Sequence, residues 1–230
     1  MDDRLLIAEE VMLLVLPDNG KLGIEFSNAE YPLTGAVLVE LAMRGLIDIR
    51  SQGKSGKRYV RAAEAASPAD PLLADALAHL GEDEHEVSSL FGTLVPKIQD
   101  TVLGRLDERG IIEREEAKFL WVFPTTHWPE KNARPEAQLR ERVSEVLVGR
   151  AEPDERIGSI IALLSASQLI KHLRPPLPWD KTIEKRVEDI EKGNWSSAAV
   201  SEAVDSVLLA VTVSMVAVTA ATTAATAATM

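Results

Sequence analysis

The chain has 230 residues, a formal net charge of −11 and no cysteine. The lack of cysteine excludes disulfides, thiolate metal sites and cysteine nucleophiles, and the acidic balance argues against generic nucleic-acid binding, which needs a basic surface. A hydrophobic share of 46% with only 4% aromatic residues predicts a folded protein whose core consists of aliphatic side chains and alanine.

The first predicted elements are two apolar helices. Residues 5–16 are apolar apart from Glu9 and Glu10, which predicts a buried helix. A second helix is predicted over residues 33–44 and closed by Gly45.

The second helix enters a hairpin through a corner that occurs twice. The stretches ELAMRGLI (40–47) and RLDERGII (105–112) each pass from an amphipathic helix through Arg-Gly into a β-like run. A basic residue in the last turn offsets the negative end of the helix dipole, and the glycine supplies the left-handed residue that ends the helix. Residues 46–50 and 58–61 then predict the strands of the hairpin. Two such corners indicate winged-helix-like units, which build binding surfaces more often than catalytic clefts.

Later helices are marked by a proline or capping aspartate at the start and a glycine or proline after the end. These signals predict helices that begin at Asp70-Pro71, Pro96, Pro135, Pro153 and Asp180 and end at Gly81, Gly110, Gly149, about Leu173 and Lys192. A second hairpin is predicted from strands at 111–114 and 118–123. A last apolar helix is expected to begin at Ser196 or Ser197.

The end of the chain carries no charge from residue 206 to 230, but only residues 207–218 are strongly apolar. This is shorter than the roughly 20 residues that span a bilayer, so we expect a buried helix with a frayed tail; a membrane anchor is the alternative. The predicted fold is mainly α, a single helical domain (1–218) around this buried C-terminal helix, with two small antiparallel β-hairpins and a tail (219–230). The acidic N-terminus lacks the positive charge of a secretory signal, so a cytoplasmic location is expected.

Candidate chemistry is sparse. The run Gly53-Lys54-Ser55 would need a glycine at position 48 to form a phosphate-binding P-loop, and Asp48 stands there; a turn is the better interpretation. His85 lies in the acidic run 82–86, which has no ligand spacing for a metal, so a solvated loop is expected. His127 could serve as a general base, but no partner is placed by the sequence. We therefore predict no catalytic residue, no metal and no cofactor.

A basic segment stands out on this acidic chain. Between Arg44 and Arg61 there are six basic residues against the single acid Asp48. One interpretation is a hairpin that contacts an anionic surface; the other is a solvated hairpin whose charges keep a sheet edge soluble. The candidate residues for an anionic-surface contact are Arg50, Lys54, Lys57, Arg58 and Arg61.

Four stretches resemble the Golgi phosphoprotein 3 family, in the same order along essentially the whole chain. LLIAEEVMLL (5–14) resembles its opening helix and GAVLVELAMRG (35–45), the most specific block, its second helix. LDERGII (106–112) is similar to a later helix–strand corner and FPTTH (123–127) to the segment after it. The alanine-rich composition resembles bacterial, actinomycete-type members.

The resemblance implies a mostly helical, cytosolic, peripheral membrane protein without enzymatic activity. Eukaryotic members bind phosphatidylinositol 4-phosphate and recognise the cytoplasmic tails of glycosyltransferases. The implied partners are therefore an anionic membrane surface or a phosphoinositide-like headgroup, at the inner face of the membrane, and protein tails.

The family's headgroup pocket of one tryptophan and three arginines does not keep its residue types here. The tryptophan position falls on Glu25 and the arginine positions on Thr34, Pro96 and Gln99. Phosphate recognition favours guanidinium groups, so we expect a scaffold with weak or changed headgroup specificity. The candidate headgroup residues, taken at or beside these positions, are Phe26, Thr34, Lys97 and Gln99.

Three functions compete. The first is a membrane or lipid-binding adaptor that recruits other proteins. The second is a winged-helix-like nucleic-acid-binding regulator, although its recognition helix (33–44) is apolar and carries Glu40. The third is a hydrolase or transferase built around His127.

Overall fold

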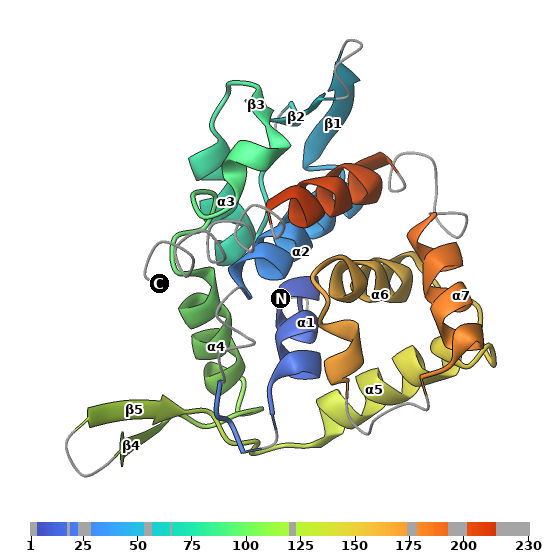
Figure 1. The fold of residues 1–230 in the computed structure, drawn as a ribbon. Helices are drawn as coiled ribbons and strands as arrows, with labels where there is room; N and C mark the ends of the chain where they lie inside the picture. Colours follow the sequence, from blue (N-terminus) through green and yellow to red (C-terminus); the bar gives the residue numbers. More distant parts are fainter. Residues whose placement is uncertain are drawn as a thin grey trace, which may run out of the picture.

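The computed structural model describes residues 4–17, 19–22, 29–52, 57–64, 66–119, 123–173, 179–192 and 202–214, with backbone alone at 51–52, 117–119 and 123–125. Within this part the protein is mainly helical with two small antiparallel sheets, as predicted (Figure 1). The helices are α1 (Ile7–Val15), α2 (Glu30–Met43), α3 (Pro71–Leu80), α4 (Ile98–Glu108), α5 (Arg134–Leu147), α6 (Glu155–Ala166), α7 (Lys181–Glu191) and a helix over residues 202–214.

Helix α1 is the centre of the fold. All nine of its residues are buried, and it lies between α4 and α6 in Figure 1 while also contacting α2 and α5. A helix with apolar side chains on every side is stable only when all of its faces are buried. The other helices therefore surround α1. The core around it is made of leucine, isoleucine, valine and alanine, as the composition predicts.

Helix α2 is buried from Pro32 to Leu41. It begins at Glu30, three residues earlier than predicted, because a proline is tolerated in the first turn, where its missing N–H has no intrahelical partner anyway. A buried helix offers no exposed face to a DNA groove, so this geometry gives the nucleic-acid alternative no support.

The two Arg-Gly corners have the same backbone structure. Gly45 has φ +66° and Gly110 has φ +67°. In each corner the residue after the glycine donates its N–H to a carbonyl five residues back, Leu46 to Leu41 and Ile111 to Leu106. This is the Schellman arrangement that satisfies carbonyls at a helix end, and it confirms the predicted ends of both helices.

The first sheet contains one strand more than predicted. Strands β1 (Ile47–Gln52) and β2 (Lys57–Ala62) pair antiparallel with Ile49 opposite Val60, and β3 (His85–Glu86) joins the other edge of β2. The interpretation of the run around His85 as a solvated loop is therefore wrong, because His85 and Glu86 are held in the sheet by backbone hydrogen bonds.

The second hairpin is shifted along the chain from its predicted position. Its strands are β4 (Glu115–Phe119) and β5 (Phe123–His127), not 111–114 and 118–123. Ile111 and Ile112 are buried in the core instead. The apolar pair that suggested a strand therefore anchors the base of the hairpin. The two sheets project from opposite ends of the helical body in Figure 1.

Helix α6 ends at Ala166, so the prediction of a helix to about Leu173 is wrong. The Ser167 hydroxyl donates to the Leu163 carbonyl at 2.7 Å, and Gln168 adopts a left-handed φ of +61°. The N–H of Leu169 then donates to the Leu164 carbonyl at 2.8 Å. This is a Schellman ending without glycine, which sequence signals do not reveal. A 3-10 turn (Ile170–His172) follows.

The helix over residues 202–214 packs along α2 with one buried face (Figure 1). Gly35 of α2 makes this approach possible, because a Cβ there would lie 2.9 Å from Val207 Cγ1. The other face exposes Leu209 and Val213, which are 50% and 55% accessible. Within the described residues no helix is both long and apolar enough to cross a membrane. The predicted cap at Ser196 or Ser197 and the 218/219 boundary lie outside the described residues.

Candidate functional site

The cations of the predicted basic hairpin are largely paired within their own sheet. Lys54 lies outside the described residues. The pairs are Arg50–Glu84 at 2.5 Å, Lys57–Glu86 at 2.7 Å and Arg61–Asp48 at 3.5 Å. Two of these acids come from the acidic run 82–86, which reaches the hairpin because β3 pairs with β2. Composition alone could not reveal these ion pairs, because the acidic run lies far from the hairpin in the sequence.

The Lys57–Glu86 pair keeps both groups charged. The hydrogen bond from Lys57, assisted by one from Ser88, lowers the pKa of the Glu86 carboxyl. The same bond raises the pKa of the Lys57 ammonium. Lys57 is therefore already committed to a carboxylate, and a membrane lipid would compete with Glu86 for it.

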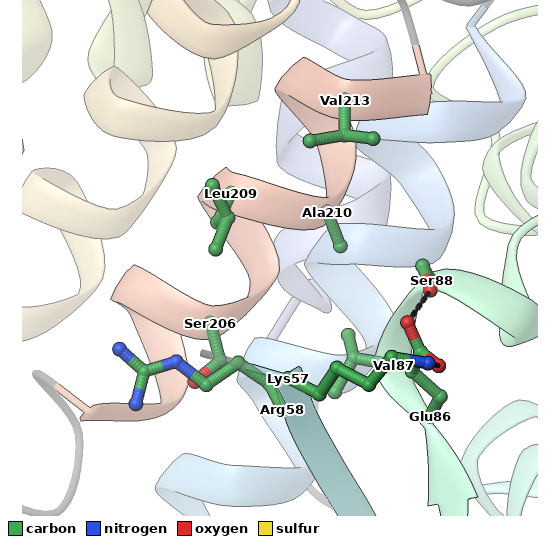
Figure 2. Close-up of a pocket in the computed structure, with 9 residues that line it drawn as sticks. All are labelled: Lys57, Arg58, Glu86, Val87, Ser88, Ser206, Leu209, Ala210 and Val213. Atoms are coloured by element: carbon green, nitrogen blue, oxygen red, sulfur yellow. Dashed lines mark hydrogen bonds and ion pairs between the residues drawn. The ribbon is translucent and has the colours of Figure 1, made fainter. Parts of the chain in front are cut away.

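A shallow cavity of about 150 Å³ lies where the hairpin meets the helix over residues 202–214. Figure 2 shows Lys57 turned toward Glu86, whereas the guanidinium of Arg58 lies beside the turn that carries Ser206. Leu209 and Val213 stand above them on the same helix. The remaining lining residues are Val87, Ser88 and Ala210.

Arg58 is the cation of this cavity that is least satisfied. Its Nε is buried and has no hydrogen-bond partner among the described residues. Burial raises the pKa of the nearby Asp205 carboxyl, and the positive charge of Arg58 acts in the opposite direction. Cationic side chains beside exposed aliphatic ones form the kind of surface that lies in a membrane interface. We call Lys57, Arg58, Leu209 and Val213 the docking face.

The predicted headgroup residues have different degrees of exposure. Thr34 is buried in α2 with 1% of its surface accessible, whereas Lys97 is exposed and Gln99 half-buried at the start of α4. Lys97 has a left-handed φ of +56°. Phe26 lies outside the described residues. Thr34 is thus withdrawn from solvent, and the four-residue pocket stays a prediction.

A buried ion network at the start of α1 was not predicted. Glu10 accepts a hydrogen bond from Arg156 at 2.6 Å, and Arg156 also donates to Glu40 at 3.1 Å. Burial raises the pKa of the Glu10 carboxyl, while Arg156 acts to lower it. Two glutamates inside an otherwise apolar helix were the available signal, since a buried carboxylate needs a cation and hydrogen bonds.

The network ends at a second cavity, of about 290 Å³, into which both Arg-Gly corners place their arginine. Arg44 comes from the end of α2 and Arg109 from the end of α4. They are joined by Arg4 and Arg105. We call this the arginine cavity; its other lining residues are Leu6, Ala69, Asp70, Pro71 and Glu108.

His85 and His127 lie in different sheets. His127 is the last residue of β5, opposite Glu115 in the exposed hairpin, and His85 lies in β3. Among the described residues no three histidine, aspartate or glutamate side chains are placed to hold a metal ion.

Comparison with known proteins agrees with the fold. A family model described as Golgi phosphoprotein 3 (GPP34) matches residues 7–207. The chain is also similar to vacuolar protein sorting-associated protein 74 of Eremothecium gossypii, with 24% identity over 169 residues, which cover 65% of this chain and 51% of that protein. The match therefore spans about half the length of this relative.

Proposed function

The chain belongs to the Golgi phosphoprotein 3 family, and we propose that it is a non-enzymatic adaptor that docks on the surface of an anionic membrane. The observation that carries this proposal is the exposure of Leu209 and Val213 next to Arg58 and Lys57. On this proposal the protein works at the inner face of the membrane and holds the tail of another protein there.

The docking face supports weak, reversible binding. Arg58 near an anionic leaflet contributes about 1 kcal/mol, whereas the charge of Lys57 is already balanced by Glu86 and is not counted. Covering the exposed halves of Leu209 and Val213 adds roughly 1 kcal/mol for each side chain. A total of about 3 kcal/mol corresponds to an affinity of several millimolar. Such a face is suited to binding that also needs a protein partner, as expected for an adaptor.

Flotation with liposomes tests the proposal. We expect the chain to float with phosphatidylserine vesicles at low salt and to lose binding as salt is added. A Leu209→Asp/Val213→Asp variant should stay with the soluble fraction, because it puts two carboxylates against the lipid. Val148→Asp is the matched control, since Val148 is a comparably exposed aliphatic residue (41%) at the end of α5. Equal flotation of both variants would show that the docking face is not used.

The same assay tests headgroup specificity. Because no arginine stands at the family's headgroup positions and Thr34 is buried, phosphatidylinositol 4-phosphate should bind no better than phosphatidylserine of equal total charge. Tight binding that depends on the phosphoinositide would contradict this, and a loss of that binding in Lys97→Gln would then place the headgroup at the start of α4.

A further inference from the structure

We propose that the open edge of strand β1 pairs with the same edge of a second copy of this chain. The first sheet has the strand order β1-β2-β3, so among the described residues β1 has a neighbouring strand on one side only. Figure 1 shows β1 as the outer strand of a sheet that projects from the helical body. The proposal does not depend on the membrane role of the docking face.

The backbone groups on the open side of β1 follow from its pairing with β2. The N–H of Ala63 donates to the carbonyl of Leu46, the residue before β1, at 2.9 Å. Backbone groups of successive residues point alternately toward and away from the partner strand, so those of Ile47, Ile49 and Ser51 point away from β2. The described residues form no hydrogen bond with these outward groups.

The charges on β1 do not protect this edge from pairing. A row of outward N–H and carbonyl groups is a template for another strand, and proteins often block it with charged side chains, lysine above all. Strand β1 instead carries one acid and one base, Asp48 and Arg50, on the same face of the sheet. Their side chains are 58% and 57% exposed, so both are accessible to a second strand.

The order of these charges selects one antiparallel register. Two-fold symmetry places the central residue of the pairing opposite its own copy. A register centred on Asp48 sets two carboxylates against each other, and one centred on Arg50 sets two guanidinium groups against each other; like charges directly opposite are destabilising. In the register centred on Ile49, Asp48 of each copy faces Arg50 of the other. This register also uses every outward residue, because Ile47 then lies opposite Ser51.

The ion pairs within one copy leave donors and acceptors for this contact. Asp48 contacts Arg61 at 3.5 Å through a single carboxylate oxygen. Arg50 uses its Nε and Nη2 on one oxygen of Glu84. The second oxygen of Asp48 and the Nη1 of Arg50 therefore have no partner among the described residues and can join across the two copies.

The shape of the molecule permits the pairing. Strand β1 runs outward from Ile47, which is buried at the helical body, and the sheet projects beyond that body in Figure 1. Antiparallel pairing therefore places the two helical bodies at opposite ends of the shared sheet. The contact involves little more than one short strand from each copy, so we expect a weak dimer of the kind formed by small interfaces.

Sedimentation equilibrium at protein concentrations up to about 1 mM tests the proposal. We expect the wild-type chain to pass from monomer to dimer over this range. Arg50→Asp should weaken dimerisation at least about tenfold, because two pairs of opposite charges become two pairs of like charges. Arg142→Asp is the matched control, since it makes the same change of charge at a side chain of α5 that is 45% exposed, and it should dimerise like wild type.

An exchange of the two charges separates the dimer contact from effects within one copy. Asp48→Arg/Arg50→Asp breaks both intrachain pairs of β1, yet it restores opposite charges between copies in the register centred on Ile49. It should therefore dimerise more tightly than Arg50→Asp and about as well as wild type. A wild-type chain that stays monomeric would overturn the proposal and leave the edge to an extended segment of another protein. Dimerisation that Arg50→Asp does not weaken, or that the exchange does not restore, would also contradict it.

Discussion

Single residues decide where the helices of this protein stop and which charges are paired. Gly45 and Gly110 were predictable, because a glycine after an arginine in the last helical turn is a local signal. Gln168 was not, because its left-handed conformation depends on Ser167 and on the packing of α6. The same contrast holds at the site: Arg58 was recognisable as a cation, but that its buried Nε has no hydrogen-bond partner among the described residues follows from the fold.

Gly45 and Gly104 should respond in opposite ways to substitution by alanine. Neither position has an atom within 4 Å of an added Cβ. The change in stability on substitution by alanine therefore depends on the backbone conformation at each position. Gly45→Ala places a side chain at φ +66° and should lower the free energy of unfolding by about 1 kcal/mol. Gly104 lies inside α4, where alanine is favoured, so Gly104→Ala should raise it by roughly 0.5–1 kcal/mol. Urea denaturation measures both; two changes of the same sign would contradict the assignment of Gly45 as the helix terminator.

Glu136 should make the stability of the protein depend on pH. Burial, together with the nearby carboxyl of Glu130, raises the pKa of Glu136 from 4.5 to about 7, although Arg140 acts to lower it. Between these values the folded protein holds a proton that the unfolded chain releases. The free energy of unfolding should therefore fall as pH rises through this range, by at most about 3 kcal/mol. Glu136→Gln should remove this part of the slope, as measured by urea denaturation at a series of pH values. The same slope in both proteins would refute the assignment.

Helices and strands with local start and stop signals were predicted best. Helices α3 and α7 begin at the predicted caps Asp70 and Asp180, whose side chains accept backbone N–H groups. The β1–β2 hairpin was also predicted, whereas β3 was missed, since two residues carry no periodic pattern. The β4–β5 hairpin was misplaced because buried isoleucines at its base resemble a strand. Capping residues close in sequence thus predicted where helices begin, whereas the positions of β3 and of the β4–β5 hairpin depend on long-range packing.

Gly35 should be the position at which three helices are most sensitive to added volume. A Cβ on α2 at this point would lie 2.9 Å from Leu163 Cδ2 of α6 and 2.9 Å from Val207 Cγ1. Gly35→Ala should therefore cost about 1–3 kcal/mol of stability, although alanine is the better helix former. Gly104→Ala, a helical glycine with open space around it, is the control. Shortening Val207 to alanine in the Gly35→Ala background should recover part of the loss. Destabilisation that Val207→Ala does not relieve would mean that the clash lies elsewhere.

The molecule as a whole is an aliphatic body crossed by one buried ion network. The network has two parts that meet at the adjacent Glu9 and Glu10 of α1. Glu9 pairs with Arg105 and Arg109 at the end of α4, and Arg156 of α6 joins Glu10 to Glu40 of α2. Composition predicted the aliphatic body, and the resemblance predicted the family. The network could not be read from the sequence because its partners lie up to 146 residues apart.

The position of Arg156 makes it the residue on which this network depends most. It contacts Glu10 of α1 and Glu40 of α2, and it donates to the carbonyl of Leu5. Arg156→Leu would leave two buried carboxylates without this cation, which typically costs about 3–5 kcal/mol. Arg142→Leu is the matched control. Arg142 pairs with Asp154 at the surface, where an ion pair contributes at most about 1 kcal/mol.

The pH dependence of the stability of Arg156→Leu shows whether the variant is destabilised by the lost charge of Arg156 or by the lost packing of its side chain. Without Arg156, the burial that already raises the pKa of Glu10 acts with less opposition, so the folded variant should take up a proton that the unfolded chain does not hold. Its free energy of unfolding should therefore rise toward that of wild type as pH is lowered toward the ordinary pKa of a glutamate. Urea denaturation at a series of pH values measures this recovery. A deficit that stays constant with pH would mean that Arg156 contributes through the packing of its side chain and not through its charge beside Glu10.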